Sequence, residues 1–444
     1  MTSCSSGARA RILVAVALAI FGAIPNAIAQ TPSPTHKHVV QDPAAVELSK
    51  LLASAQKALN EEDFETAAQD YQDYLSKKPE DAIAHFQLGY AYTGLKKPED
   101  AKSEYQKAIE IDPEMDAAYL NLGLTLLESD AAAAVAPLQK AAELKPEEPR
   151  AAFLLGAAYE RTGKLPQAIE QYQAAEKLGA SNFDIRFSLG RVFLTTKRAA
   201  DAEPEFRAAI ALQPDSAAAH LGLAQSLLAE KKTDAAETEL ASYLAAQPED
   251  VQARIDHASL LIDLGKYDAA LVELDKIRPT QADDIRVLKL RSDALFDLKR
   301  YADAIPLLDK AAKLAPQDPE ITARLGHLYL EKKDYPNAVT ELTIAMKMDP
   351  SSSDVLADLV GAEYLSKNYA AALQGIELLS QRKSLPIGSI FIRATCYDRL
   401  GQKELALDSY KKFLELNKDE NSDMYFEATG RARTLTHELL EKKR

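Results

Sequence analysis

The chain has 444 residues, of which 47% are hydrophobic and 27% are charged, and only 17 are Gly and 21 are Pro. This composition excludes a largely disordered, collagen-like or low-complexity protein, and the length suffices for two or three ordinary domains or for one long repeat array. The formal net charge of -14 disfavours binding to the phosphates of nucleic acid or to anionic lipid.

Residues 1–29 have the pattern of a secretory signal peptide. Two arginines are their only charges, residues 12–24 form an apolar run, and Ala27 and Ala29 stand at a small-residue cleavage site. The apolar run is shorter than the roughly 20 residues that a membrane-spanning helix requires. We therefore expect cleavage before Gln30, export to the periplasm or the medium, and no integral membrane span afterwards. Retention as an uncleaved anchor is the alternative.

The segment after the signal peptide, residues 30–43, contains several prolines and no helical periodicity, which predicts a flexible linker. Its His36 and His38 favour weak, adventitious metal binding, because no third ligand is near in sequence. After cleavage Cys396 would be the single cysteine, so that no intramolecular disulfide could form. We expect this cysteine to be packed inside a helix.

A regular repeat organises the rest of the chain. Large apolar side chains stand four residues after each of a series of alanines, and proline often stands twelve residues after them. The spacing between successive alanines is 34 throughout, apart from one interval of 33. The alanines are Ala67, Ala101, Ala134, Ala168, Ala202, Ala236, Ala270, Ala304, Ala338, Ala372 and Ala406.

Each unit of this repeat predicts two helices. In residues 82–113, apolar residues at helical spacing form one stripe, the pattern breaks at residues 94–98, and a second stripe starts at Ala101. Neither stripe can be buried alone, so the helices must pack in pairs and the pairs must stack. The alanine allows the two helices to approach closely, and the larger residue one turn later fills the space beside it.

The repeated residues resemble the tetratricopeptide repeat. One unit presents the family pattern as Leu88, Gly89, Tyr92, Ala101, Tyr105, Ala108 and Pro113. The resemblance implies an all-α, right-handed superhelical solenoid of stacked antiparallel helix pairs. It covers residues 44–419 as about eleven units, and residues 420–444 are expected to form a C-terminal capping helix. No unit has the tryptophan of the family pattern, and the units around Ala270 and Ala372 lack its Gly and Pro.

In proteins of this family the first helix of each unit lines the concave face that receives a partner. The resemblance therefore implies that the binding face lies around the Leu-Gly positions, and in the N-terminal half this face is mostly apolar and aromatic. We expect it to bind a protein or peptide that presents apolar side chains, although stacking alone would also explain large residues here. The candidate groove residues are Phe86, Tyr90, Leu120, Leu124, Phe153, Phe187, Arg191 and Leu221.

The corresponding positions in the C-terminal half are polar and mixed. They include Ile255, Ser259, Lys289, Asp293, Ala323, His327 and Asp358. The Lys and Asn set with which some family members bind a carboxylate-terminated peptide does not occur in these positions, and an acidic ligand is not expected.

The sequence offers no catalytic centre. It contains no dinucleotide-binding G-x-G-x-x-G loop and no G-x-S-x-G nucleophile motif, and the His437-Glu438 pair lacks the second histidine of a zinc-protease helix. No cofactor and no metal site are predicted. The favoured function is an exported, non-enzymatic scaffold for protein interactions. The alternative is an accessory subunit of an envelope polysaccharide-synthesis or secretion complex, and an enzyme with an unrecognised site comes third.

Overall fold

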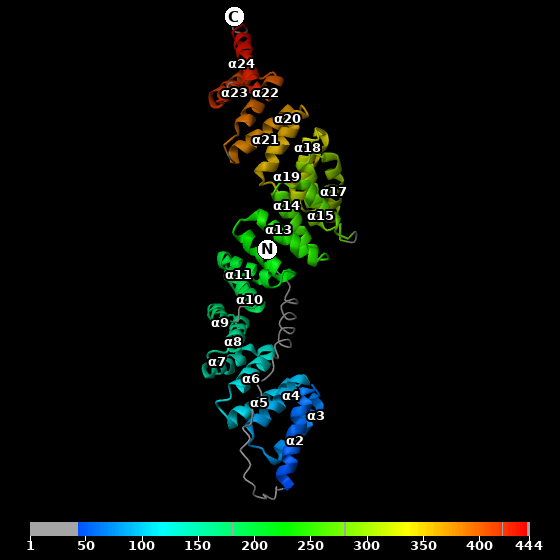
Figure 1. The fold of residues 1–444 in the computed structure, drawn as a ribbon. Coiled ribbons are helices and arrows are strands. Elements are labelled where there is room, and N and C mark those ends of the chain that lie inside the picture. Colours follow the sequence, from blue (N-terminus) through cyan, green and yellow to red (C-terminus); the bar gives the residue numbers. More distant parts are fainter. Residues whose placement is uncertain (1–42, 180–181, 279–280, 383, 420, 442–444) are drawn as a thin grey trace. The chain divides into compact units, whose positions relative to one another are not determined.

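The computed structural model describes residues 43–179, 182–278, 281–382, 384–419 and 421–441, and in these residues the secondary structure is helical throughout. The predicted signal peptide and residues 30–42 of the predicted linker lie outside the described residues. The helices (Figure 1) are α2 (Pro43–Asn60), α3 (Phe64–Lys77), α4 (Ala82–Gly94), α5 (Pro98–Ile111), α6 (Asp116–Ser129), α7 (Ala131–Leu144), α8 (Pro149–Arg161), α9 (Leu165–Lys177), α10 (Phe183–Thr195), α11 (Ala199–Leu212), α12 (Ala217–Ala229), α13 (Thr233–Ala246), α14 (Val251–Asp263), α15 (Tyr267–Asp275), α16 (Ile285–Asp297), α17 (Tyr301–Leu314), α18 (Pro319–Glu331), α19 (Tyr335–Met348), α20 (Ser353–Leu365), α21 (Tyr369–Arg382), α22 (Ile387–Arg399), α23 (Lys403–Leu416) and α24 (Asp423–Glu441).

The chain divides into two compact parts, residues 1–104 and residues 105–444. In the first part, α2 packs on α3 and α3 packs on α4. In the second part, α6 pairs with α7, and the same pairing continues to α22 and α23. Each second helix also packs on the first helix of the next pair, and α24 packs on α23. The predicted all-α array of stacked antiparallel helix pairs is therefore confirmed.

The repeated alanines occupy the contact between the two helices of each unit. All eleven are fully buried, with 0% of their surface exposed. The larger side chain four residues later is buried beside each one, as Phe206 is beside Ala202. The glycine of the first helix meets this larger side chain, because a Cβ atom at Gly190 would lie 2.9 Å from the ring of Phe206. The repeat pattern thus encodes the packing inside each unit.

The turn between the paired helices contains a residue in the left-handed region. The N–H groups of this residue and of the next residue donate to carbonyl oxygens of the first helix. Lys299 donates to the Phe296 carbonyl at 2.8 Å, and Arg300 donates to the Leu295 carbonyl at 2.8 Å. This is a Schellman ending, which glycine favours because it has no Cβ. Glycine fills it at Gly163, Gly265 and Gly401, whereas side-chain-bearing residues fill it at Glu62, Lys96, Lys197, Lys231, Lys299, Lys333 and Lys367.

The shortened unit uses a different turn. The N–H of Asp130 bonds to the Leu126 carbonyl at 2.7 Å and so ends α6, while its carboxylate accepts the N–H groups of Ala132 and Ala133 and so starts α7. Because one residue caps both helices, no left-handed residue is needed between them. This double cap explains why the alanine series has one interval that is a single position shorter than the others.

Four units carry the same polar clamp between their two helices. A cationic or imidazole side chain near the start of the first helix contacts a carboxylate 19 residues later on the second helix, and three of these side chains also bond the carbonyl of the preceding proline. Buried polar groups need such partners. The pairs are His85 with Glu104, Arg186 with Glu205, His220 with Glu239 and Arg254 with Glu273.

One sequence expectation about a single residue is answered by this packing. Cys396 is buried at 0% exposure, and burial raises the pKa of its thiol to about 12, which confirms a packing role. His85 and His220 serve the clamps, and the described residues contain no group of three His, Cys, Asp or Glu side chains that could hold a metal ion. No helix in the described part of the chain is long and apolar enough to cross a membrane.

Candidate functional site: a pocket on the first-helix face

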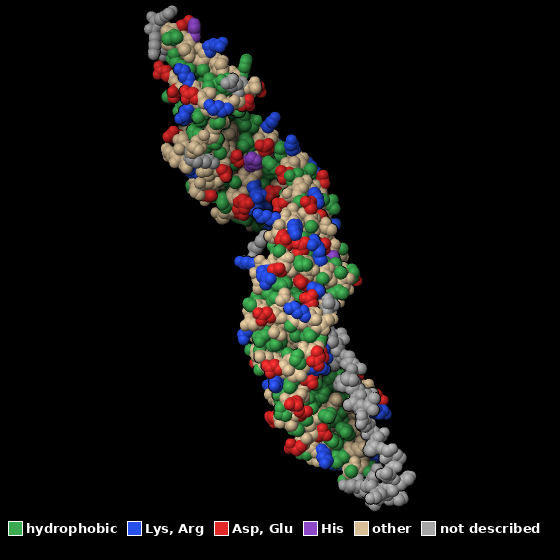
Figure 2. All heavy atoms as spheres, turned by 60° about the vertical axis from the view of Figure 1, so that its left-hand side comes forward, with side chains coloured by type: hydrophobic (Ala, Val, Ile, Leu, Met, Phe, Trp, Pro, Cys, Tyr) green, Lys and Arg blue, Asp and Glu red, His purple; other side chains and the backbone are tan. Residues whose placement is uncertain are grey.

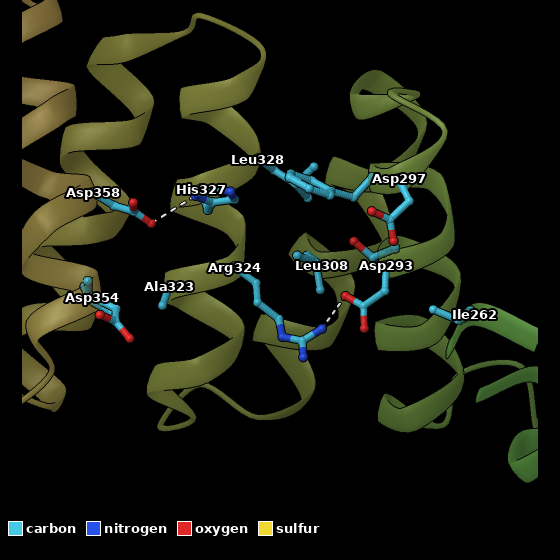
Figure 3. A pocket seen from close by; sticks show the side chains of 13 residues that line it. Ile262, Asp293, Asp297, Leu308, Ala323, Arg324, His327, Leu328, Asp354 and Asp358 are labelled. Carbon is cyan, nitrogen blue, oxygen red and sulfur yellow. Dashed lines mark hydrogen bonds and ion pairs between the residues drawn. The ribbon is translucent and has the colours of Figure 1, made fainter. Parts of the chain in front are cut away.

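A pocket lies in the second part of the chain, where first helices of successive units stand next to one another (Figure 3). Its volume is about 480 Å³. Helices α16, α18 and α20 supply most of its lining, and α14 and α17 supply one residue each. The lining residues are Ile262, Ser292, Asp293, Phe296, Asp297, Leu308, Ala323, Arg324, His327, Leu328, Asp354, Val355 and Asp358.

The repeat places the polar side chains of the pocket on one face. Asp293 and His327 are exactly one repeat apart, as are Arg324 and Asp358, so each pair occupies the same position in successive first helices. The apolar side of these helices is used for packing, as the 3% exposure of Leu325 shows. The polar positions are therefore left on the open side of the first helices.

Side-chain caps fix where the three main helices of the pocket begin. Asp284 accepts the N–H of Arg286 at 2.8 Å, Asp318 accepts that of Glu320 at 2.9 Å, and Ser352 accepts that of Val355 at 3.3 Å. Such caps satisfy N–H groups that have no partner within the helix. The caps hold the first turns of α16, α18 and α20, and with them Asp354 and Val355 of the lining.

Arg324 of α18 points to the α16 wall of the pocket. Its guanidinium pairs with Asp293 (Figure 3) and also with Glu320 of its own helix at 3.0 Å. Burial alone would lower the pKa of Arg324, but the hydrogen bond to Asp293 and the charges of Asp293 and Glu320 outweigh it and raise the pKa above its usual value. The α16 wall thus already holds one guanidinium that belongs to the protein itself.

His327 of α18 points to the opposite side of the pocket, which α20 forms. Its Nδ1 lies 2.9 Å from a carboxylate oxygen of Asp358 on α20, and its ring centroid lies 5.3 Å from that of Phe296 on α16. The hydrogen bond to Asp358 raises the pKa of His327 above its usual value, against the opposing effect of burial. The imidazole therefore favours its protonated form more than a free histidine does.

The pocket has a surplus of acidic groups. With His327 protonated, the lining still carries two more negative than positive charges, and with His327 neutral it carries three more. Its one hydroxyl belongs to Ser292, which is 1% exposed, and the lining includes no cysteine. This composition suits binding. The charged residues are Asp293, Asp297, Asp354 and Asp358 on the acidic side and Arg324 and His327 on the other.

The predicted groove residues of the first part lie on α4. Phe86 is buried at 9% exposure. Tyr90 is half-buried, with its ring centroid 6.3 Å from that of Phe64, and burial raises the pKa of its hydroxyl. Both side chains thus contribute to packing within residues 1–104.

In the second part, the predicted groove residues divide into buried and half-buried side chains. Leu120 is buried at 9% exposure, while Leu124 and Leu221 are half-buried. Phe153 and Phe187 pack on the core around Tyr172 and Phe206, at centroid distances of 5.6 Å and 5.8 Å. Arg191 pairs with Glu160 at 2.8 Å and lies 5.9 Å from the Phe187 ring. None of these residues of the second part lines the pocket over α16, α18 and α20.

The structure brings together instead a part of the polar set noted for the C-terminal half. Asp293, Ala323, His327 and Asp358 all line the pocket. Sequence analysis missed Arg324 and Phe296. A signal for Arg324 existed in the spacing of charged residues. Asp293 precedes Arg324 by 31 residues, and the two residues pair between neighbouring first helices. The pairs Glu160 with Arg191 and His327 with Asp358 have the same separation and also join neighbouring first helices.

The fold defines an α-helical repeat protein, and the pocket lies on its first helices. Tetratricopeptide repeat models match residues 52–116, 128–184, 187–251 and 323–382, which together exceed half of the chain, and related models match residues 227–294, 295–343 and 387–420. The chain belongs to the tetratricopeptide repeat family, whose members are generally scaffolds for proteins or peptides and typically are not enzymes. No curated protein matches the sequence.

Several solved structures are similar to stretches of the chain. YrrB, described as a tetratricopeptide repeat protein with an unusual peptide-binding site, is 24% identical over 42% of this chain and 96% of its own, with a TM-score of 0.38. MamA from Desulfovibrio magneticus RS-1 is 22% identical over 38% of this chain and 97% of its own, with a TM-score of 0.37. The tetratricopeptide domain of P58(IPK) is 16% identical over 90% of this chain and 100% of its own, with a TM-score of 0.33.

Proposed function

We propose that the protein is a non-enzymatic scaffold that binds a segment of a partner protein in the pocket over α16, α18 and α20. The observation that carries this proposal is the pocket itself, a concave space of about 480 Å³ on the first-helix side. Ligand pockets in proteins commonly enclose roughly 300–1,000 Å³. Membership of a family of protein-binding scaffolds supports the same function.

The half-buried apolar residues of the second part are proposed as further contacts of the partner. Phe153, Phe187 and Leu221 keep part of their surface open, although Phe153 and Phe187 also pack on the core. A double change of Phe153 and Phe187 to Ala should weaken partner capture while the helical circular dichroism persists. Loss of the helical signal would assign both residues to packing alone.

Site-specific photocrosslinking tests the location of the binding face. A photoreactive amino acid replaces Ala323, which lines the pocket, and in a matched variant it replaces Ala302, an exposed alanine of the second helix α17. Irradiation in the native host should give defined adducts from position 323 and not from position 302. Adducts only from position 302, or none from either, would contradict binding at the pocket.

We also propose that the protein is exported and acts in the cell envelope or the medium, on the basis of the signal-peptide pattern in residues 1–29. Function as an accessory subunit of an envelope complex would use the same binding face. N-terminal sequencing of protein recovered from the envelope or the medium should give Gln30 as the first residue. A membrane-bound species that begins at Met1 would contradict cleavage.

A further inference from the structure

One of the clamps that join paired helices uses a histidine with an acceptor at each ring nitrogen. The Nδ1 of His220 on α12 lies 2.6 Å from a carboxylate oxygen of Glu239 on α13. The Nε2 of the same ring lies 2.9 Å from the carbonyl oxygen of Pro214, in the turn before α12. The side chains of His220 and Glu239 are 15% and 23% exposed, so water has little access to this contact.

The two contacts of His220 fix the number of protons that the clamp holds. A carbonyl oxygen and an ionised carboxylate can only accept hydrogen bonds, and a neutral imidazole has a single N–H to donate. Both contacts are satisfied when both ring nitrogens are protonated, or when Glu239 carries the second proton and donates it to Nδ1. In either form the pair holds one proton more than a neutral histidine beside an ionised glutamate.

The next unit places a permanent cation at the same position. Arg254 donates from Nε and Nη2 to the Pro248 carbonyl, at 2.9 Å and 2.6 Å, and pairs through Nη1 with Glu273. Each of these three residues follows its counterpart in the His220 clamp by one repeat of 34 residues. Arginine keeps its charge at any pH that a protein meets. The two clamps therefore have the same geometry, but only the charge of the His220 clamp can be removed.

Two other units support this comparison. His85 repeats the histidine form, with Nδ1 2.5 Å from Glu104 and Nε2 2.9 Å from the Pro79 carbonyl. In the unit that follows the Arg254 clamp, leucine stands at both positions, as Leu288 and Leu307. The carboxylate is thus absent from the one unit in this series in which the cation is absent.

We propose that the His220 clamp is a proton-dependent joint, which holds the α12–α13 pair to the turn after α11 and loosens when its extra proton is lost. Without that proton one ring nitrogen faces an acceptor with a lone pair, and a hydrogen bond is lost in a mostly buried contact. The free energy of opening this pair is therefore larger at low pH and falls as the pH rises. Neither His220 nor Glu239 lines the pocket described above, so this property is separate from the proposed binding site.

The helices packed on α12 carry other charged groups. Helices α10, α11 and α13 pack on α12, in which His220 is the one ionisable residue. Most charged groups of these helices pair with one another or with neighbouring units, whereas Glu239 is bonded to the ring. These pairs are Arg186 with Glu205, Glu203 with Arg207, Arg191 with Glu160, Asp201 with Arg198, and Glu237 and Asp234 with Lys266. The remaining ionisable groups are Asp184 on α10, Asp215 in the turn before α12, and Tyr243 on α13, which donates to Asp250.

The rest of the surface also responds to pH. Acidic and basic side chains are interspersed over the face that Figure 2 shows, and the net charge of -14 changes as any histidine gains a proton. The experiment must therefore compare the His220 joint with another part of the same molecule. Helices α22 and α23 contain no histidine and provide this comparison.

Hydrogen exchange of the full chain, followed by mass spectrometry at about pH 6 and about pH 8, measures the joint. Protection factors are corrected for the pH dependence of intrinsic exchange. We expect protection in α12 and α13 to fall about tenfold from the lower pH to the higher, and protection in α22 and α23 to change by less than about twofold. No fall in α12 and α13, or an equal fall in both helix pairs, would overturn the inference.

Glu239→Gln then removes the need for the extra proton. The amide of glutamine can donate to the bare Nδ1 of a neutral His220 ring while the Nε2–H donates to the Pro214 carbonyl. Protection of α12 and α13 in this variant should change by less than about twofold between the two pH values. A tenfold fall that persists in Glu239→Gln would overturn the inference.

His220→Arg tests the same joint from the other side, because it copies the Arg254 clamp. This variant should also show less than about a twofold change in α12 and α13. If circular dichroism shows that arginine disrupts folding here, Glu239→Gln decides alone. A tenfold fall in both variants would assign the pH dependence to another group, such as His257, whose Nε2 lies 3.3 Å from Glu237, and would overturn the inference.

Discussion

Single residues of the pocket set how its charge responds to pH. The pKa of His327 is raised, mainly by its hydrogen bond to Asp358, so its proton is lost above the usual value of 6.5. The sign of the effect on stability follows from this shift. The contribution of His327 to the free energy of unfolding is fully present below the pKa that this histidine has in the unfolded chain. It is lost as the pH rises through the pKa that the histidine has in the folded chain.

The same titration predicts that the free energy of unfolding falls as the pH rises through the folded pKa of His327. Loss of the His327 proton removes a positive charge from a pocket whose other charged neighbours are Asp293, Asp297, Arg324, Glu331, Asp354 and Asp358. Urea unfolding at a series of pH values should show this part of the stability being lost between about pH 6 and pH 8. The His327→Gln variant should lack this dependence. A dependence of equal size in that variant would remove His327 as its source.

The left-handed turns also act at the scale of single residues. Lys299 and Lys333 hold φ values of 58° and 65°, in the region that favours glycine. A side chain there costs roughly 1–2 kcal/mol, whereas glycine adds conformational entropy to the unfolded chain, roughly 0.5–1 kcal/mol. Lys299→Gly and Lys333→Gly should therefore each stabilise the fold by about 0.5 kcal/mol, the difference between these two effects.

Urea unfolding measures this prediction, with each substitution expected to move the midpoint upward. Lys411→Gly is the control, because Lys411 is an exposed residue inside α23 and glycine there should destabilise by about 1 kcal/mol. A lower midpoint for Lys299→Gly would mean that the lysine side chain contributes more than the backbone strain costs.

At the scale of helix pairs, the buried alanine limits how closely the two helices pack. Ala202 of α11 is fully buried in the core with Leu189 and Phe206. Ala202→Leu should overpack this contact and cost about 1–3 kcal/mol. The neighbouring Ala200 is exposed, so that Ala200→Leu is the matched control and should have little effect.

Hydrogen exchange shows how far this damage extends. Since each helix packs mainly on its neighbours, Ala202→Leu should lower protection in α10 and α11 and leave α20 to α23 unchanged. Uniform loss of protection across the second part would contradict the view that each pair is stabilised locally.

At the scale of the whole molecule, the described residues of the second part divide into several buried clusters and show no single central core. Its buried clusters gather around successive helix pairs, such as those around Phe206, Leu308 and Tyr410. Thermal unfolding of this part should therefore depart from a two-state transition, and the calorimetric enthalpy should exceed the van't Hoff enthalpy. A ratio of one would show that residues 105–444 unfold as one cooperative unit.

The helix pairs were predictable from the sequence because each pair repeats the same packing solution. Ala202 and Phe206 stand at positions whose role is set within one unit, and eleven copies of the alanine make the pattern plain. The turns were harder to predict, because lysine replaces glycine at most left-handed positions and carries no warning of its backbone conformation.

The pocket could be predicted only in part. Asp293 and His327 were visible as polar positions on first helices, but the pocket depends on three helices and on the directions of long side chains. Arg324 follows the expected groove position by one residue and reaches back to Asp293 on the previous unit. A pattern within a single unit cannot encode such a contact.

The double cap at Asp130 shows where a unit can change its length without loss of its packing. One residue replaces the usual end of one helix and start of the next, and Ala134 and Leu138 remain fully buried. Natural variation in repeat length should therefore collect at this turn, and gaps in alignments of related arrays belong there. An engineered array built from copies of this shortened unit would need no left-handed residue between its paired helices.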